Sequence, residues 1–414
     1  MQLLNQLRNK TGLHRYPKGI WAAMGIQAIR VTGYSISYTY LALYLYQHRH
    51  ISMTVIGAFI LISGIISGAF QILGGVLADR FGHRKMFIIF QTADVLFFGL
   101  LAMLIGLNSE VWSIFIVSTL ASIMGGMSAP AISAMVSDVS QQDHLTESYG
   151  LMAIGMNLGW AIGPLAGGFL KNNTSFAWVF AVGALVASLS LFGSPFLPRD
   201  VKTKATELLT RQYLKMFIKD TTLIVFCILC ILFFLDIGQW GSTLSVFTVD
   251  RIGFSTEQYG LLMSISGVLI IIFQYPISSR VEWLGTGKAL FLGCLFYGVG
   301  FLSLSWVKSF VPAIGSIAVM VAGEMLFVPT SYSVIGKLSR AEDRGKNMGL
   351  LGLCGTVGSS CGPLLGGFLL DQFPTQPLYV WGPIAFPAFI AAVGFLLWRG
   401  PSRTEVLKGK EKKT

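Results

Sequence analysis

The chain has 414 residues, of which 53% are hydrophobic and only 12% are charged, and its net charge is +11. A soluble domain carries about 25% charged residues, so this composition excludes an ordinary soluble protein and predicts one that lies in lipid. The positive charge does not indicate nucleic-acid binding, because the Lys and Arg residues lie in short segments between long apolar runs.

Twelve apolar runs follow one another along the chain. Crossing the ~30 Å hydrocarbon core takes roughly 20 residues in a helix. Only helices and closed barrels satisfy every backbone group in lipid, and runs of this length exclude barrel strands. The sequence therefore predicts an all-α polytopic membrane protein with 12 transmembrane helices, at residues 19–46, 53–77, 85–107, 111–137, 146–170, 175–196, 221–249, 256–279, 287–307, 310–337, 346–371 and 378–398.

The basic residues sort by side of the membrane. Nearly all of the 30 Lys and Arg residues lie in the two terminal segments or in every second loop. The other loops hold only Arg49, Lys171, Arg251 and Lys308. Because basic loops stay on the cytoplasmic side, we expect a multi-pass protein of the inner (cytoplasmic) membrane with both termini in the cytoplasm.

The chain contains two copies of one unit. Gly150, Gly163 and Pro164 in the fifth run match Gly349, Gly362 and Pro363 in the eleventh, in the same order and spacing. We expect two six-helix bundles related as parallel repeats, at residues 1–198 and 221–398. Between them, residues 199–220 predict a cytoplasmic linker with an amphipathic helix, and residues 399–414 form a basic tail. Parallel repeats place the substrate site near the bilayer midplane.

The link between the second and third runs reads GGVLADRFGHRK, from Gly74 to Lys85. This pattern resembles the loop signature of the major facilitator superfamily of secondary transporters. The resemblance implies a gate in which Asp79 packs against the start of the eleventh helix and Arg84 pairs with Asp138, while Glu282 stands in a degenerate second copy. The gate residues that it implies are Gly75, Asp79, Arg80, Gly82, Arg84, Lys85, Asp138 and Glu282.

A stripe of glycines follows one face of the fifth helix. Small residues at this spacing let two helix backbones approach closely, and plain packing therefore stays open as its role. The stripe also resembles the antiporter signature of the superfamily, which implies export by exchange. Its residues are Gly155, Gly159, Gly163, Pro164, Gly167 and Gly168.

Four charged residues lie deep within the apolar runs: Arg30, Asp94, Asp236 and Glu324. Inserting such a charge into the membrane at mid-helix costs a free energy of at least ~2.5–3.5 kcal/mol, so each residue needs a partner or a polar cavity. The resemblance places the helices of Arg30, Asp236 and Glu324 around a central cavity, where a buried carboxyl group is easier to protonate than in water. We expect proton coupling there; a static ion pair with Arg30 stays open. For Asp94 we expect a structural ion pair, with Arg30 as the candidate partner.

Aromatic and amide side chains accompany these charges on the same helices. Aromatic faces beside carboxylates suit amphipathic cations, although core filling would give a similar pattern. The resemblance departs in the fourth helix, where Ser118 stands at a position that is Arg in many proton-coupled drug exporters. The candidate lining residues are Tyr34, Tyr38, Asn157, Trp160, Gln239, Trp240 and Tyr332.

These features favour proton-driven efflux of amphipathic or cationic small molecules by alternating access. A proton-coupled symporter of a nutrient and a lipid translocase stay open, and a non-transporting sensor is disfavoured. An enzyme is not expected, because no loop offers a metal cluster, a phosphate-binding glycine loop or a nucleophile with a base. The expected partners are a small-molecule substrate, protons and the lipid bilayer, with no cofactor, metal or nucleic acid and with a monomeric chain.

Overall fold

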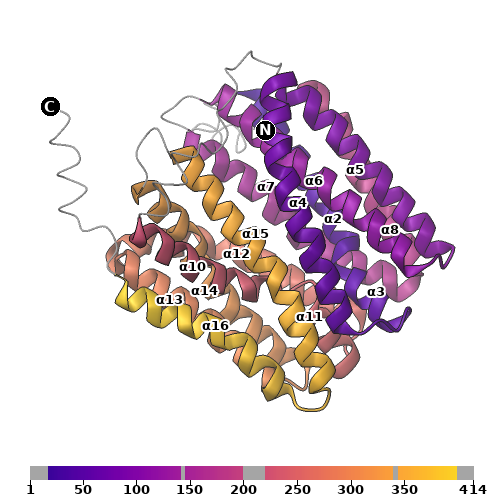
Figure 1. Cartoon of the computed structure of the whole chain (residues 1–414), viewed down its shortest axis with the longest axis vertical. Coiled ribbons are helices and arrows are strands. Elements are labelled where there is room, and N and C mark those ends of the chain that lie inside the picture. Colours follow the sequence, from indigo (N-terminus) through magenta and orange to yellow (C-terminus); the bar gives the residue numbers. More distant parts are fainter. Residues whose placement is uncertain (1–16, 141–144, 199–219, 339–343, 399–414) are drawn as a thin grey trace, which may run out of the picture. The chain divides into compact units, whose positions relative to one another are not determined.

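The structure is a computed structural model, and it describes residues 17–140, 145–198, 220–338 and 344–398 (Figure 1). These residues are almost entirely helical and contain no strand. The predicted linker helix and the basic tail lie outside the described residues, apart from Asp220 at the end of the linker.

The helices of the first repeat follow the predicted runs in order. The first run forms α2 (Lys18–Ser37), the short 3-10 helix η2 (Tyr38–Tyr40) and α3 (Leu41–Gln47). The next five are α4 (Met53–Phe81), α5 (His83–Gly106), α6 (Val111–Val139), α7 (Leu145–Asn173) and α8 (Phe176–Phe192), with η4 (Ser194–Phe196) after them.

The second repeat has the same plan. The seventh run forms α10 (Thr221–Ile237), α11 (Thr243–Val246) and η5 (Phe247–Arg251). It is followed by α12 (Thr256–Leu284), α13 (Thr286–Ser303) with η6 (Leu304–Trp306), α14 (Phe310–Leu338), α15 (Arg344–Gln372) and α16 (Pro377–Leu397).

The first and seventh runs, which we expected to be single helices, are broken at equivalent places. Gly238 and Gly241 flank the break after α10, and glycine weakens a helix interior. Before η2, the hydroxyl groups of Ser35 and Ser37 donate to carbonyl oxygens of the preceding turn, a pattern that bends helices. Ten of the other described helices are long and apolar enough to span a bilayer.

The two repeats pack their helices in the same pairs. In the first, α2 contacts α7 and α8, and α5 contacts α6 and α8. In the second, the equivalent helices do the same: α10 contacts α15 and α16, and α13 contacts α14 and α16. The expected all-α fold with two parallel six-helix repeats is therefore confirmed.

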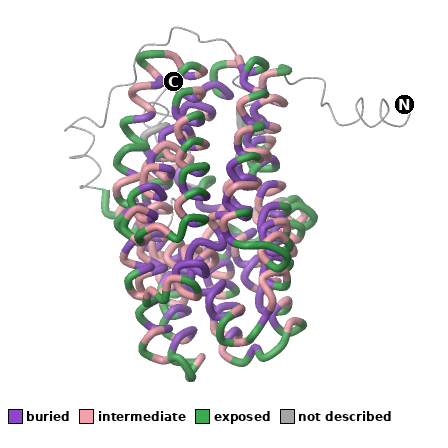
Figure 2. Tube along the Cα trace, turned by 90° about the vertical axis from the view of Figure 1, so that its right-hand side faces the viewer, coloured by how far each residue is buried: buried purple, intermediate pink, exposed green. Residues whose placement is uncertain are grey.

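Residue contacts divide the chain into two units that do not coincide with the repeats. One unit is Met1–Ser37 with Ile66–Thr206, and the other is Tyr38–Ile65 with Glu207–Thr414. The chain between η2 and the middle of α4 thus packs with helices of the second repeat. Buried residues alternate with exposed ones along the helices, as expected for helices that each present one face to lipid (Figure 2).

Candidate functional site

Asp236 lies in the last turn of α10 with its side chain completely buried. Neither of its carboxylate oxygens has a hydrogen-bond partner among the described residues. Burying an unpaired carboxylate costs several kcal/mol, so this group is poised either to hold a proton or to bind a cation. Asp236 is therefore the first candidate for a coupling residue in the second repeat.

A tyrosine that no sequence motif singles out also lies in this region. Tyr297 on α13 is completely buried, and its hydroxyl oxygen accepts a 2.6 Å hydrogen bond from the indole Nε1 of Trp240. Nothing in the motif around Tyr297 distinguishes it from the other aromatic residues of an apolar helix, so only the fold reveals it.

Stacked rings form an apolar wall beside these groups. The ring of Phe233 lies 3.7 Å from that of Phe327 and 4.6 Å from that of Tyr297, measured between centroids. Phe327 comes one turn after Glu324 on α14, so the same helix carries the Glu324 carboxyl group and part of the aromatic wall. The arrangement combines aromatic faces with two acidic groups, which is the chemistry that attracts an organic cation.

In the first repeat, Arg30 is fixed by polar groups of α2 and α6. Its guanidinium group donates to the Ser128 hydroxyl at 3.0 Å, to the Gly125 carbonyl at 3.3 Å and to the Gln27 amide oxygen at 3.3 Å. Asp94 is buried beside the same turn of α6 and attracts Arg30 electrostatically. Arg30 therefore has neutral partners and a nearby carboxylate within its own unit.

The lining residues expected from the sequence occupy different environments. Tyr34 meets the edge of Trp160 with centroids 6.2 Å apart, which brings two of them together. Gln239 is fully buried and braces the helix break, because it donates to the Gly362 carbonyl at 2.8 Å and accepts from Thr243. Tyr38 and Asn157 are half-buried and Tyr332 is exposed.

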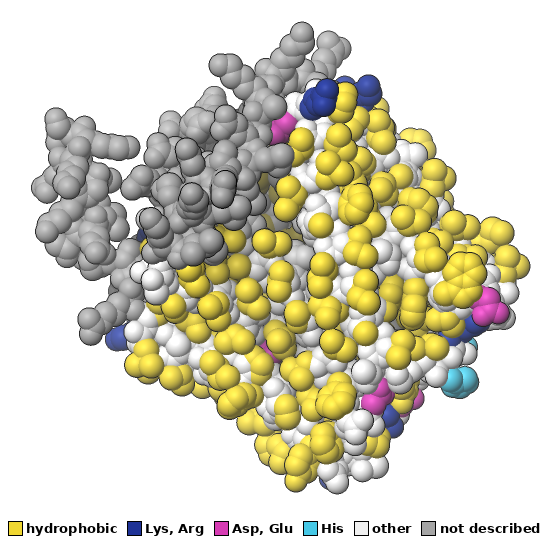
Figure 3. All heavy atoms as spheres, in the orientation of Figure 1, with side chains coloured by type: hydrophobic (Ala, Val, Ile, Leu, Met, Phe, Trp, Pro, Cys, Tyr) yellow, Lys and Arg dark blue, Asp and Glu magenta, His cyan; other side chains and the backbone are white. Residues whose placement is uncertain are grey.

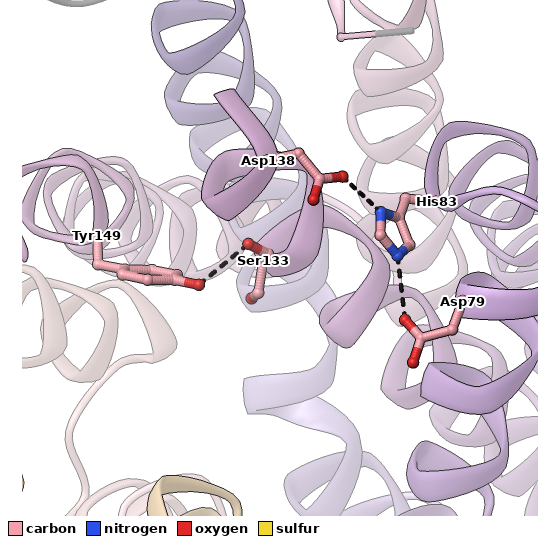
Figure 4. Close-up of polar contacts among 5 residues, drawn as sticks. All are labelled: Asp79, His83, Ser133, Asp138 and Tyr149. Carbon is pink, nitrogen blue, oxygen red and sulfur yellow. Dashed lines mark hydrogen bonds and ion pairs between the residues drawn. The ribbon is translucent and has the colours of Figure 1, made fainter. Parts of the chain in front are cut away.

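The gate signature folds into a three-residue cluster centred on His83, a residue that was not among the expected gate residues. Its Nε2 lies 3.1 Å from Asp79 Oδ1, and its Nδ1 lies 2.8 Å from Asp138 Oδ2 (Figure 4). These residues come from α5, α4 and α6, so one imidazole links the ends of three helices. Asp138, for which we expected Arg84 as partner, is thus contacted by His83.

The turn that carries this cluster needs glycine at one position. Gly82 has φ of 104°, a conformation that other residues rarely adopt, and Gly285 repeats it at 78° in the second copy. Arg80 and Lys85 are exposed, and Arg80 lies over the ring of Phe81 at 5.2 Å. Lys and Arg side chains gather at this end of α4 and α5 while hydrophobic ones cover the helix faces (Figure 3).

Two parts of the expected gate are not described. The side chain of Glu282 and those at the start of α15, where Asp79 was expected to pack, lie outside the described residues. Gly75 has room for a methyl group, whereas its neighbour Gly74 lies against the backbone of Met127.

The glycine stripe of α7 packs against α2. A Cβ atom at Gly155, Gly159 or Gly163 would collide with Met24, Val31 or Ser35 respectively. In the second repeat, Gly358 and Gly362 of α15 lie in the same way against the α10 backbone. The stripe therefore has a packing role in both repeats.

In the described part of the chain, no group of three His, Cys, Asp or Glu residues could hold a metal ion.

Comparison with known proteins agrees with this architecture. The model of the Major Facilitator Superfamily matches residues 23–322 and 252–414. The MFS-type transporter YttB of Bacillus subtilis is 28% identical over 84% of this chain and 88% of its own length. Multidrug resistance protein 1 of the same organism is 24% identical over 85% of this chain and 89% of its own.

A solved structure shows the same fold at lower sequence identity. A mutant of the nucleoside transporter NupG superposes with a TM-score of 0.76 at 14% identity, covering 92% of this chain and 99% of that one. With the duplicated helices, the gate signature and the family match together, the chain belongs to the major facilitator superfamily of membrane transporters.

Proposed function

We propose that this transporter exports amphipathic organic cations in exchange for protons by alternating access. The observation that carries the proposal is the buried carboxyl group of Asp236, which has no hydrogen-bond partner among the described residues and comes one helical turn after Phe233 of the aromatic wall. The stacked partner of Phe233, Phe327, comes one turn after Glu324. A proton and an organic cation would compete for the same negative charge, and this competition couples their fluxes. The similarity to a multidrug resistance protein supports this substrate class.

The proposal includes an orientation. Segments rich in Lys and Arg alternate with loops that hold few of them. By the positive-inside rule, we infer that the protein lies in the inner membrane with both termini in the cytoplasm. The His83 cluster lies on the cytoplasmic side in this orientation. The protons then run inward, and each proton that moves down ~100 mV contributes ~2.3 kcal/mol to export.

The test is uphill transport of a fluorescent organic cation by proteoliposomes under an imposed pH gradient. We expect Asp236→Asn and Glu324→Gln each to abolish uphill transport, because neither amide can exchange a proton. Glu110→Gln removes an exposed carboxylate at the start of α6 and serves as the matched control, with transport unchanged. Full uphill transport by both buried variants would show that these carboxylates do not couple the fluxes.

A further inference from the structure

One carboxylate of α15 holds the beginning of α4. Asp371 Oδ1 accepts a hydrogen bond from the Met53 backbone N–H at 3.0 Å. Its Oδ2 accepts from the Thr54 backbone N–H at 2.7 Å and from the Thr54 hydroxyl at 2.6 Å. All three donors lie in the first two residues of α4, and Asp371 lies one residue before the end of α15.

The physical reason for this contact is the unsatisfied start of α4. The first N–H groups of a helix have no partner within the helix, and the helix dipole makes this end positive. The Ser52 hydroxyl accepts from the Val55 N–H at 3.4 Å, while the N–H groups of Met53 and Thr54 are left to Asp371. A carboxylate satisfies both and adds charge-assisted bonds.

The backbones of α4 and α15 also touch along this stretch. A Cβ atom on Gly57 would collide with Pro363, one on Gly64 with Ser360, and one on Gly367 with the Met53 carbonyl. The contact with Asp371 is therefore the end of a continuous helix pairing and not an isolated surface bond.

Two further bonds tie the same part of the first repeat to the second. Arg251 donates to the Tyr46 hydroxyl at 2.8 Å, and Tyr40 donates to the Thr256 carbonyl at 3.4 Å. Residues 38–65 therefore pack in one unit with the second repeat. If the first repeat moved away from the second, these two hydrogen bonds would have to break.

We infer that Asp371 is the latch that keeps the outer side of the transporter closed, and that it releases the start of α4 when the substrate site opens outward. The inference rests on the proposed orientation and on alternating access, and it assigns to Asp371 a role in the cycle. Because α4 and α15 run in opposite directions, Asp371 near the end of α15 faces the start of α4. Asp79, near the end of α4, was expected to face the start of α15 in the same way.

The two carboxylates would then act as reciprocal latches at opposite ends of one helix pair. The Asp371 latch is suited to opening, because it is only half-buried and water can replace the carboxylate at the freed N–H groups. Loss of Asp371 favours the outward-open state, and loss of Asp79 favours the inward-open state. Loss of both leaves the balance close to that of the unaltered protein.

The experiment measures the distance between spin labels at His48→Cys and Thr375→Cys in a protein whose native cysteines are replaced. Both positions are exposed in the loops next to the latch. We expect Asp371→Asn to raise the ratio of long to short distances by about 2- to 30-fold, the range that loss of a helix cap produces. Asp79→Asn should lower the ratio, and the double variant should restore it. Glu110→Gln should leave it unchanged.

Thr54→Val keeps the shape of the side chain and removes only the hydroxyl donor, so it tests the latch without removing the carboxylate. It should raise the ratio in the same direction by a smaller factor. An unchanged ratio in both Asp371→Asn and Thr54→Val would overturn the inference, even if the protein exports cations. A raised ratio in a protein that exports no organic cation would support the latch and reject the proposed substrate class.

Discussion

At the scale of single residues, His83 makes its cluster with Asp79 and Asp138 sensitive to protonation. A neutral imidazole has one N–H donor, whereas the protonated ring has two and can donate to Asp79 and Asp138 together. The two carboxylates are the charged groups that contact it on the neighbouring helices α4 and α6. The neutral ring would direct a nitrogen lone pair at one of the two carboxylates, and that contact is repulsive. The hydrogen bonds of the cluster are therefore strongest at a pH low enough to protonate the imidazole.

We therefore expect the thermal stability of the detergent-solubilised protein to fall as pH rises above about 6.5, where an imidazole loses its second proton. His83→Arg keeps a charge at every pH, so its stability should depend less on pH over the same interval. His83→Gln should be less stable at acidic pH and should also lose the dependence. Equal pH dependence in all three proteins would contradict this role for the imidazole.

The sequence points to Asp79, Asp138, Asp236 and Glu324 because charge is rare in apolar runs and the gate signature is distinctive. It does not point to His83, Tyr297 or Asp371. Each of these is recognised by a contact with a segment that is distant in the chain. Asp371 in particular looks like an ordinary polar residue at the end of an apolar run, and only the fold brings it to the start of α4.

At the scale of helices, the periodicity of apolar residues predicts where each helix lies but not where it breaks. The first and seventh runs stay apolar through their breaks, so hydropathy alone gives one long helix in each case. The glycines at 238 and 241 are a signal for the second break. The first has no glycine or proline at η2, and it depends on hydroxyl groups that bond to their own helix.

Close helix pairing predicts unequal effects of equal substitutions in α7. Gly159→Ala adds a methyl group that would collide with Val31 of α2, and such overpacking costs typically ~1–3 kcal/mol. Gly150→Ala, in the same helix, meets open space and should be neutral or slightly stabilising, since alanine favours helix. Thermal unfolding of the two variants in detergent provides the comparison. Equal loss of stability in the two variants would mean that α2 and α7 lie further apart at Gly159 than they do in the structure.

In the second repeat, the same comparison uses α15. Gly362→Ala would collide with the Leu235 carbonyl of α10, whereas Gly352→Ala has free space. We expect the first to lower the unfolding temperature by an amount similar to that of Gly159→Ala, because the two repeats use equivalent helix pairs. A stable Gly362→Ala protein would argue that the repeats have diverged in how tightly these helices pack.

At the scale of the whole molecule, the roles proposed for Asp79, Asp371 and the coupling carboxylates depend on the orientation of the chain in the membrane. The His83 cluster and Asp371 lie near opposite ends of the long helix α4. If the termini faced outward, the roles of the two ends would exchange, and the protons would reach the site from the other side. Orientation is therefore the property on which the direction of transport depends.

The distribution of basic residues predicts that Lys202 and Lys410 face the cytoplasm and that Asn172 faces outward. Each is replaced by cysteine in turn, in a protein whose native cysteines are first removed. A membrane-impermeant thiol reagent added to intact cells should then label position 172 alone, and all three positions should react once the membrane is opened. Labelling of position 202 or 410 in intact cells would reverse the orientation, because the bilayer stops the reagent from reaching cytoplasmic loops. The inner-side role of Asp79 and the outer-side role of Asp371 would then be exchanged.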